Sequence, residues 1–144
     1  MKLTFQDYIS INIHKTDLLL TGFIKSKLEP FNLAPEQNLI MMLLWEKDGL
    51  TQNQLVEKLA KDKTNIARMA SNLEKKGFIK RVHCQDDRRA VKLYLTSRGK
   101  ELGDEVIPVA EAFNDKVVKG ISHEELLELE RLLAKIKENV LSPN

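Results

Sequence analysis

The chain has 144 residues, of which 23 are Lys or Arg and 21 are Asp or Glu, and hydrophobic residues make up 42% of it. This length and apolar content suffice for one domain, or for one compact unit with an added dimerisation element, and they exclude global disorder. The formal net charge of +2 is too small for the whole chain to indicate binding to a polyanion.

The charge is nevertheless unevenly distributed. Residues 1–50 carry 5 Lys/Arg and 6 Asp/Glu, a net charge of −1. Residues 51–96 carry 11 Lys/Arg and 5 Asp/Glu, a net charge of +6. Residues 97–144 carry 7 Lys/Arg and 10 Asp/Glu, a net charge of −3. A basic excess confined to the middle third is expected where one face of the protein contacts nucleic acid and the two ends do something else.

The cellular compartment can be inferred from what the chain contains. Cys84 is the single cysteine, so an intramolecular disulfide is excluded and a reducing compartment is favoured. Residues 1–15 lack the basic segment and apolar run of a signal peptide. The apolar run Leu18–Leu20 is too short to span a bilayer. We therefore expect a soluble, cytoplasmic protein.

The first half of the chain reads as helices. Residues 8–29 are apolar along more than one stripe, which predicts a first helix buried on more than one side, as at a subunit contact. Pro30 ends this helix, and Pro35 suits the first turn of a second helix that closes at Gly49.

Two short helices follow the second. Thr51 and Gln54 have the spacing of a capping box, and Asp62 is suited to cap the next helix, which ends at Gly77. The two helices are joined by a short polar turn, which is the organisation of a helix-turn-helix. The residues predicted to face inward in the second of them are Ile66, Met69, Ala70 and Leu73.

A hairpin is predicted next. Residues 78–83 and 91–96 have strand character, and Val91, Leu93 and Leu95 alternate with polar residues. The tip between the strands carries Asp86, Asp87, Arg88 and Arg89. Arginines held near carboxylates on a hairpin tip can enter a DNA groove. A solvated charged turn is the alternative, but a helix-turn-helix followed by a hairpin favours a winged helix-turn-helix.

The last third is again helical. Thr96 is a suitable cap for a helix over residues 97–119, and Pro108 should kink that helix or break its hydrogen-bond ladder. Ser122 and Glu125 form a second capping box. The final helix has the apolar spacing of a coiled-coil seam, formed by Leu126, Leu129, Leu133, Ile136 and Val140.

Two segments together resemble a known family. The recognition helix of the MarR (multiple antibiotic resistance regulator) family is similar to residues 62–68 (DKTNIAR) and 73–79 (LEKKGFI). The wing of that family is similar to residues 87–90 (DRRA) together with Leu93, Leu95, Thr96 and Gly99. The resemblance implies a mainly α fold with a small β-hairpin, in which residues 35–96 form the winged DNA-binding part. Residues 1–34 and 97–144 would form dimerisation helices. The implied function is a homodimeric regulator of transcription, in particular a ligand-responsive repressor that binds a pseudo-palindromic operator.

The predicted DNA contacts fall in two places. In the fourth helix, asparagine suits adenine and arginine suits guanine, while lysine and threonine also suit phosphate. The resemblance places the groove-inserting arginine at Arg89, oriented by Asp87, with Arg88 on the backbone. A register slip between the two arginines stays open. The predicted contacts are Lys63, Thr64, Asn65, Arg68, Asp87, Arg88 and Arg89, and candidate phosphate contacts are Lys75, Lys80, Arg81, Lys92 and Arg98.

The family resemblance also implies a small aromatic effector between the dimerisation helices and the winged part. The available side chains are His14, Phe23, Met41 and Trp45, for which core packing is the competing interpretation. Cys84 is interpreted as a passive strand residue. The three histidines are widely separated in the sequence, so we expect no metal site and no cofactor.

A protein-docking module and an enzyme are the two alternative functional classes. A winged helix can also serve as a protein-docking module. The basic middle third and the arginine-rich tip favour DNA over that alternative. An enzyme is not expected, because the sequence contains no phosphate-binding glycine loop and no nucleophile with a paired base.

Overall fold

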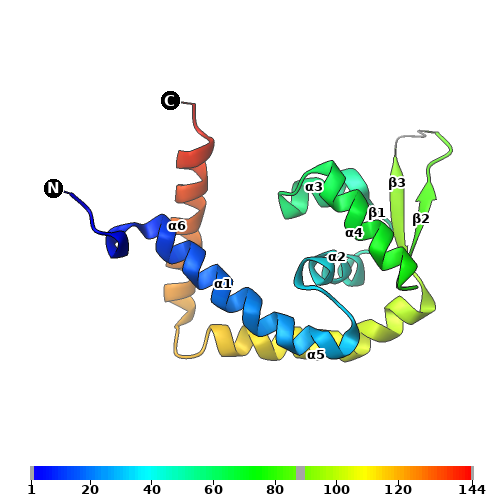
Figure 1. Ribbon diagram of the computed structural model, residues 1–144, viewed down its shortest axis with the longest axis horizontal. Coiled ribbons are helices and arrows are strands. Elements are labelled where there is room, and N and C mark those ends of the chain that lie inside the picture. The colour runs from blue at the N-terminus through cyan, green and yellow to red at the C-terminus, as the bar shows by residue number, and fades with distance from the viewer. Residues whose placement is uncertain (1, 87–89, 144) are drawn as a thin grey trace. The chain divides into compact units, whose positions relative to one another are not determined.

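The computed structural model of the protein describes residues 2–86 and 90–143 (Figure 1). The chain divides into two compact units, residues 1–109 and residues 110–144. Its fold is mainly helical with one small antiparallel sheet, and it is the winged helix-turn-helix predicted from the sequence.

The first unit contains most of the helices, and local sequence signals explain where they begin. Pro35 occupies the first turn of α2. The hydroxyl of Thr51 accepts a hydrogen bond from the Gln54 backbone N–H, and the carboxylate of Asp62 caps α4 in the same way, so both predicted caps are confirmed. The helices are η1 (Phe5–Asp7), α1 (Ile9–Leu28), η2 (Glu29–Phe31), α2 (Pro35–Glu46), α3 (Gln52–Leu59), α4 (Lys63–Lys75) and the start of α5 (Ser97–Val117).

The sheet has three strands in the order β1-β3-β2. The predicted hairpin is formed by β2 (Ile79–His83) and β3 (Val91–Leu95), in a register that pairs Ile79 with Leu95 and His83 with Val91. The sequence did not predict β1 (Leu50–Thr51), which pairs Leu50 with Leu93. Two residues are too few for an alternating pattern to be visible.

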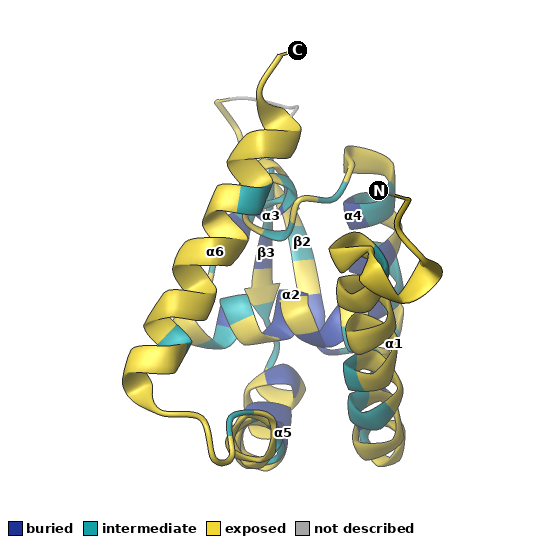
Figure 2. Cartoon of the chain, turned by 90° about the vertical axis from the view of Figure 1, so that its left-hand side faces the viewer, coloured by how far each residue is buried: buried dark blue, intermediate teal, exposed yellow. Residues whose placement is uncertain are grey.

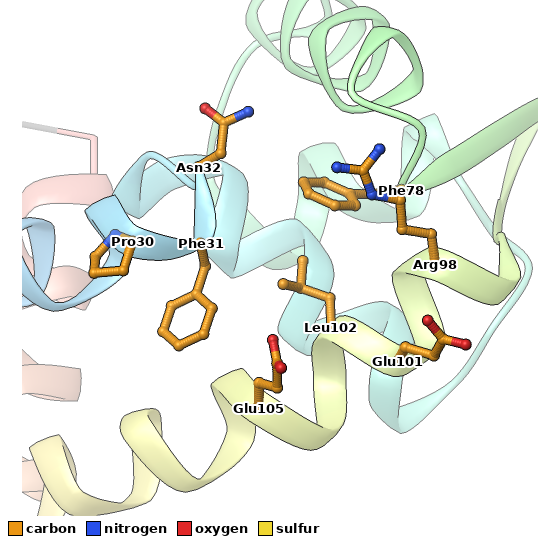
Figure 3. A pocket seen from close by; sticks show the side chains of 8 residues that line it. All are labelled: Pro30, Phe31, Asn32, Phe78, Arg98, Glu101, Leu102 and Glu105. Atoms are coloured by element: carbon orange, nitrogen blue, oxygen red, sulfur yellow. The ribbon is translucent and has the colours of Figure 1, made fainter.

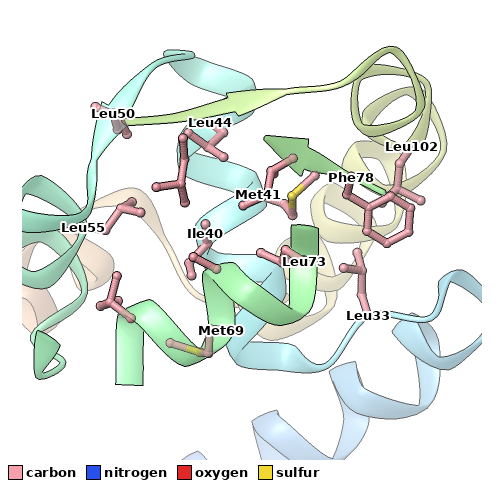
Figure 4. Packing of buried hydrophobic residues seen from close by; sticks show 14 of the residues in the cluster. Leu33, Ile40, Met41, Leu44, Leu50, Leu55, Met69, Leu73, Phe78 and Leu102 are labelled. Carbon is pink, nitrogen blue, oxygen red and sulfur yellow. The ribbon is translucent and has the colours of Figure 1, made fainter. Parts of the chain in front are cut away.

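One hydrophobic core lies in the first unit and joins its helices to the sheet (Figure 4). The four inward residues predicted for α4 are all buried, as is Leu93 at the centre of β3. Other members come from α2, from α3 and from α5, including Ile40, Met41, Leu44, Leu55, Leu102 and Val106. This core holds α3, α4 and the sheet in a defined arrangement, which a DNA-reading surface requires.

The start of α5 is fastened to the turn after α4. The Thr96 hydroxyl accepts a hydrogen bond from the Gly99 backbone N–H at 3.1 Å, which confirms the predicted cap, and donates one to the Gly77 carbonyl at 2.6 Å. A Cβ at Gly99 would lie 2.1 Å from the Phe78 carbonyl oxygen. Thr96 and Gly99, two residues of the wing signature, therefore act as a structural joint.

The second unit contains the end of α5 and all of α6 (His123–Leu141). Pro108 does not end α5; its missing N–H removes one hydrogen bond from the ladder, and the boundary between the units follows Val109. The predicted Ser122–Glu125 capping box is confirmed. No residue of α6 is buried in the described chain, as Figure 2 shows.

Much of α1 is also exposed (Figure 2). Of its residues, only Leu28 is buried, while Ile9, Leu18 and Leu19 are 63%, 58% and 76% exposed. The expectation that this helix is buried at a subunit contact concerns an assembly of two chains, so it stays a prediction.

Candidate nucleic-acid interface

Helix α4 has two distinct faces. Ile66, Met69, Ala70 and Leu73 are buried against the core and fix the position of the helix. On the opposite side, Lys63, Thr64 and Arg68 are exposed and Asn65 is half-buried. The four predicted contact residues of α4 thus lie together near its N-terminal end, which is the end that enters the major groove in helix-turn-helix proteins.

Three of the polar side chains at this end form a hydrogen-bonded row. One carboxylate oxygen of Asp62 accepts from the Asn65 backbone N–H at 2.7 Å, and the other accepts from Asn65 Nδ2 at 3.3 Å. Asn65 Oδ1 accepts from Arg68 Nη2 at 2.9 Å. Residues three apart are neighbours on a helix surface, so the row follows one face of α4.

The first wing strand is joined to α4 through Glu74 and Arg81. The Glu74 carboxylate accepts from the Arg81 backbone N–H at 2.9 Å and from its guanidinium at 3.2 and 3.1 Å. The backbone hydrogen bond, and after it the guanidinium, hold the pKa of Glu74 below its ordinary value. Because Arg81 is engaged within the protein, it is a weaker phosphate candidate than the sequence alone indicated.

The other basic candidates differ in how accessible they are. Lys75 and Lys80 are exposed, and Lys92 is half-buried. The guanidinium of Arg98 lies 5.2 Å from the centre of the Phe78 ring, a cation–π geometry. The wing residues Asp87, Arg88 and Arg89 lie outside the described residues, so their predicted roles stay predictions.

Sequence reasoning missed the role of Lys76. Its Nζ donates to the Asn32 carbonyl and to Gln37 Oε1, each at 2.7 Å, and so links the end of α4 to the turn after η2 and to the first turn of α2. Burial lowers the pKa of this lysine. The spacing Met69, Leu73, Lys76 places it on the inward face of α4, and that periodicity was the signal available in the sequence.

A cavity of about 350 Å³ lies beside α5 in the first unit (Figure 3). Its wall combines aromatic and aliphatic side chains with one guanidinium and two carboxylates. The lining residues are Pro30, Phe31, Asn32, Phe78, Arg98, Glu101, Leu102 and Glu105. Half of these residues are polar or charged, so the cavity offers a small molecule both apolar contact and charge.

The four predicted effector residues are not gathered at this cavity. Met41 is fully buried in the core, and His14 is exposed on α1. Phe23 lies under the ammonium of Lys27, 5.4 Å from it. The Trp45 indole N–H donates to the Gly99 carbonyl at 2.9 Å, and this side chain lines a second cavity of about 410 Å³ with Leu95, Lys100, Asp104 and others.

Neither a metal-ion site nor a membrane-spanning helix is found among the described residues. Within residues 2–86 and 90–143, no group of three or more His, Cys, Asp or Glu side chains is placed to hold a metal ion. No helix in this part of the chain is long and apolar enough to cross a membrane. Cys84 is half-buried, and its backbone N–H donates to the Ala90 carbonyl at 2.9 Å.

A sequence model of the MarR family matches residues 33–91, the segment from the start of α2 to the start of β3. The chain has the winged helix-turn-helix fold of the MarR family, and the matched segment has that family's sequence pattern. Proteins of this family are DNA-binding transcriptional regulators and not enzymes.

Solved structures of MarR proteins resemble the chain over nearly its full length. A putative MarR family transcriptional regulator from Listeria monocytogenes, in complex with a 26mer DNA, is 28% identical with a TM-score of 0.80, over 97% of this chain and 90% of that one. AbsC from Streptomyces coelicolor is 25% identical with a TM-score of 0.85, over 97% of both chains. MepR of S. aureus, in a complex with DNA, shares the fold: it is 24% identical with a TM-score of 0.84, over 96% of this chain and 99% of that one.

Proposed function

We propose that this protein is a homodimeric, ligand-responsive repressor of the MarR family that binds a pseudo-palindromic operator sequence-specifically. The observation that carries the proposal is the exposed polar end of α4, with Lys63, Thr64, Asn65 and Arg68 side by side in the basic middle third of the chain. In this proposal residues 35–96 bind DNA, and residues 1–34 and 97–144 form the dimer. The DNA complex of the Listeria relative supports the same use of the fold.

The wing supplies the second contact in this proposal. Arg89 enters the groove next to the recognition helix, Asp87 orients its guanidinium, and Arg88 contacts the backbone. A carboxylate two residues away limits the rotamer freedom that a guanidinium loses on binding. The hydrogen bonds between Glu74 and Arg81 support this arrangement, because they anchor the base of the wing to α4.

Dimerisation is supported by the apolar surface of the two terminal regions. In α6, Leu129, Leu133 and Val140 are 48%, 36% and 78% exposed in one chain, and they belong to the predicted seam. Exposed apolar residues at such spacing on a helix are suited to packing against a second helix. Two copies of α4 then address two half-sites, which accounts for a pseudo-palindromic operator.

The cavity beside α5 is the proposed effector site. Phe31, Phe78 and Leu102 offer apolar contact to a small aromatic compound, and Arg98 offers a positive charge. None of the four predicted effector residues, His14, Phe23, Met41 and Trp45, lines this cavity, and core packing stays the competing interpretation for them. An effector in this cavity would contact Asn32, whose carbonyl accepts a hydrogen bond from Lys76 at the end of α4. Effector binding can therefore shift the position of α4 through this hydrogen bond.

The experiment is a DNA titration with the duplex that precedes the protein's own gene. We expect saturable binding, and the logarithm of the affinity should fall with the logarithm of the salt concentration by about 0.9 per phosphate neutralised. Arg89→Ala should weaken binding strongly while sizing shows an unchanged dimer, and Arg131→Ala, in α6, is the matched control. Unchanged affinity of Arg89→Ala would refute the wing assignment, and a flat salt response would refute DNA contact by the basic third.

A further inference from the structure

The hydrogen-bonded row on α4 assigns different tasks to its members. Both partners of Asn65 select the same orientation of its side-chain amide. The Asp62 carboxylate only accepts hydrogen bonds, so it faces Nδ2, and the Arg68 guanidinium only donates them, so it faces Oδ1. The amide is therefore held by two groups with opposite requirements, and reversing it would lose both contacts.

This geometry restricts what Asn65 can recognise. A bidentate contact with adenine uses the carbonyl and the N–H of an asparagine together. Here the carbonyl is engaged by Arg68 and the amide nitrogen by Asp62, and the side chain is half-buried. Reading adenine would require Asn65 to leave both partners.

Arg68 has the opposite properties. It is exposed, and a single nitrogen of its guanidinium is engaged by Asn65 in the described structure, which leaves further N–H groups for a base edge. A guanidinium that is already oriented loses less rotamer freedom when it binds. Two parallel hydrogen bonds from arginine to O6 and N7 of guanine are the commonest specific contact in the major groove.

We propose that Arg68 reads a guanine in each half-site and that Asn65 is a positioning residue, held by Asp62, that aims the Arg68 guanidinium. This inference rests on the proposed function, because it requires α4 to occupy the major groove of a specific operator. In this arrangement Arg68 makes the base contact and Asn65 orients it, whereas the sequence alone suggested that each of the two residues contacts a base independently.

The test begins with the wild-type protein, which is used to select duplexes from a random-sequence library. Affinities are then measured at fixed salt for the selected duplex and for its single base-pair variants. The proteins compared are the wild type, Asn65→Ala, Arg68→Ala, the double variant, and Lys63→Ala as a control on the same helix. Circular dichroism and sizing establish that each variant is folded and has the wild-type oligomeric state.

We expect Arg68→Ala to lose about 10- to 100-fold of the preference for one G·C pair in each half-site. Asn65→Ala should lose part of the preference at that same base pair, and the double variant should be no worse than Arg68→Ala, since one contact is lost in either case. Lys63→Ala should weaken all duplexes alike. Additive losses at two different base pairs would overturn the inference, as would an equal loss by Arg68→Ala on every duplex.

Asp62→Asn provides a second test that keeps the helix cap, because asparagine and aspartate cap about equally well. The variant replaces the carboxylate oxygen that faces Asn65 Nδ2 with an amide donor. The Asn65 amide then reverses to accept from it and turns its own N–H groups toward Arg68. We expect reduced preference at the Arg68 base pair without a loss of overall affinity, because a negative charge near DNA is removed. An unchanged preference would overturn the positioning role.

The same measurements separate the two proposals. A wild-type protein that binds every duplex with equal affinity would overturn both the proposed function and this inference. A clear wild-type consensus whose base preferences are unaffected by Asn65→Ala would leave the proposed function intact and overturn the positioning role alone.

Discussion

Glu74 in the recognition helix α4 binds both the backbone and the side chain of Arg81 in the first wing strand. The three hydrogen bonds measure 2.9, 3.2 and 3.1 Å, and the two side chains are 37% and 31% exposed. The carboxylate thus ties α4 to β2, the two elements that the proposed function places against DNA. A part of the wing that is fixed in this way needs less ordering when DNA binds.

Glu74→Gln should test this connection. The amide retains one acceptor but loses the charge and the second carboxylate oxygen, so we expect a loss of about 1 kcal/mol in the free energy of unfolding, a value reduced for the partial exposure of the pair. Urea denaturation at pH 7 and fixed protein concentration measures it. Because the folded-state pKa of Glu74 is lowered, its contribution is complete above the ordinary value of 4.5 and is lost as the pH falls through the folded-state pKa.

The difference between the wild type and Glu74→Gln should therefore shrink below pH 4.5. Glu128→Gln is the matched control, because Glu128 pairs with Arg131 within one exposed helix. We expect little change in stability for that variant, as is usual for surface pairs. A Glu74→Gln protein with wild-type stability at pH 7 would show that the contact does not hold the wing base.

Signals that act over three or four residues allowed much of the fold to be predicted. The caps Thr51, Asp62 and Ser122 bind backbone groups three residues away, so capping-box spacing at Thr51 and Ser122 and the residue type at Asp62 identified three helix starts. The alternation around Leu93 identified the wing in the same way. The family resemblance added the assignment of the wing arginine, which lies outside the described residues and stays a prediction.

Long-range contacts could not be predicted from the sequence. Lys76 binds the Asn32 carbonyl 44 residues away, and the Trp45 indole binds the Gly99 carbonyl 54 residues away. Such pairs depend on the packed core: periodicity places Lys76 on the inward face of α4 but does not show which groups it meets. The engagement of Asn65 by its two partners was also missed, because spacing shows that the residues are neighbours but not which hydrogen bonds they form.

Gly99 has a steric role that its place in the wing signature does not reveal. Gly99→Ala would place a Cβ 2.1 Å from the Phe78 carbonyl oxygen, a backbone atom that cannot yield without moving the start of β2. We expect the free energy of unfolding to fall by about 1–3 kcal/mol, despite the higher helix propensity of alanine. Lys100→Ala, at the exposed next position, should change stability by less than about 0.5 kcal/mol. Equal stability of the two variants in thermal denaturation would contradict the close approach.

Lys75 and Lys76 are adjacent lysines with different environments, so they form a matched pair. Lys76→Met should lower the free energy of unfolding by about 1–2 kcal/mol, because it removes the hydrogen bonds to Asn32 and Gln37. Lys75→Met removes the same charge from an exposed position and should affect stability little. If Lys75 contacts phosphate, that variant should also reduce the salt slope of DNA binding by about 1. The same stability for both variants would show that the Lys76 contacts do not contribute.

Leu133→Asp tests whether α6 forms the dimer. Leu133 is 36% exposed within one chain, so an aspartate there is tolerated in a monomer but would be buried and unpaired in an interface between two chains. We expect the variant to elute and sediment as a monomer, with the α-helical content of the first unit retained and with greatly weakened binding to a two-half-site duplex. Lys135→Asp introduces the same residue two positions away, outside the predicted seam, and should stay dimeric. A dimeric Leu133→Asp protein at micromolar concentration would show that the apolar stripe of α6 packs elsewhere.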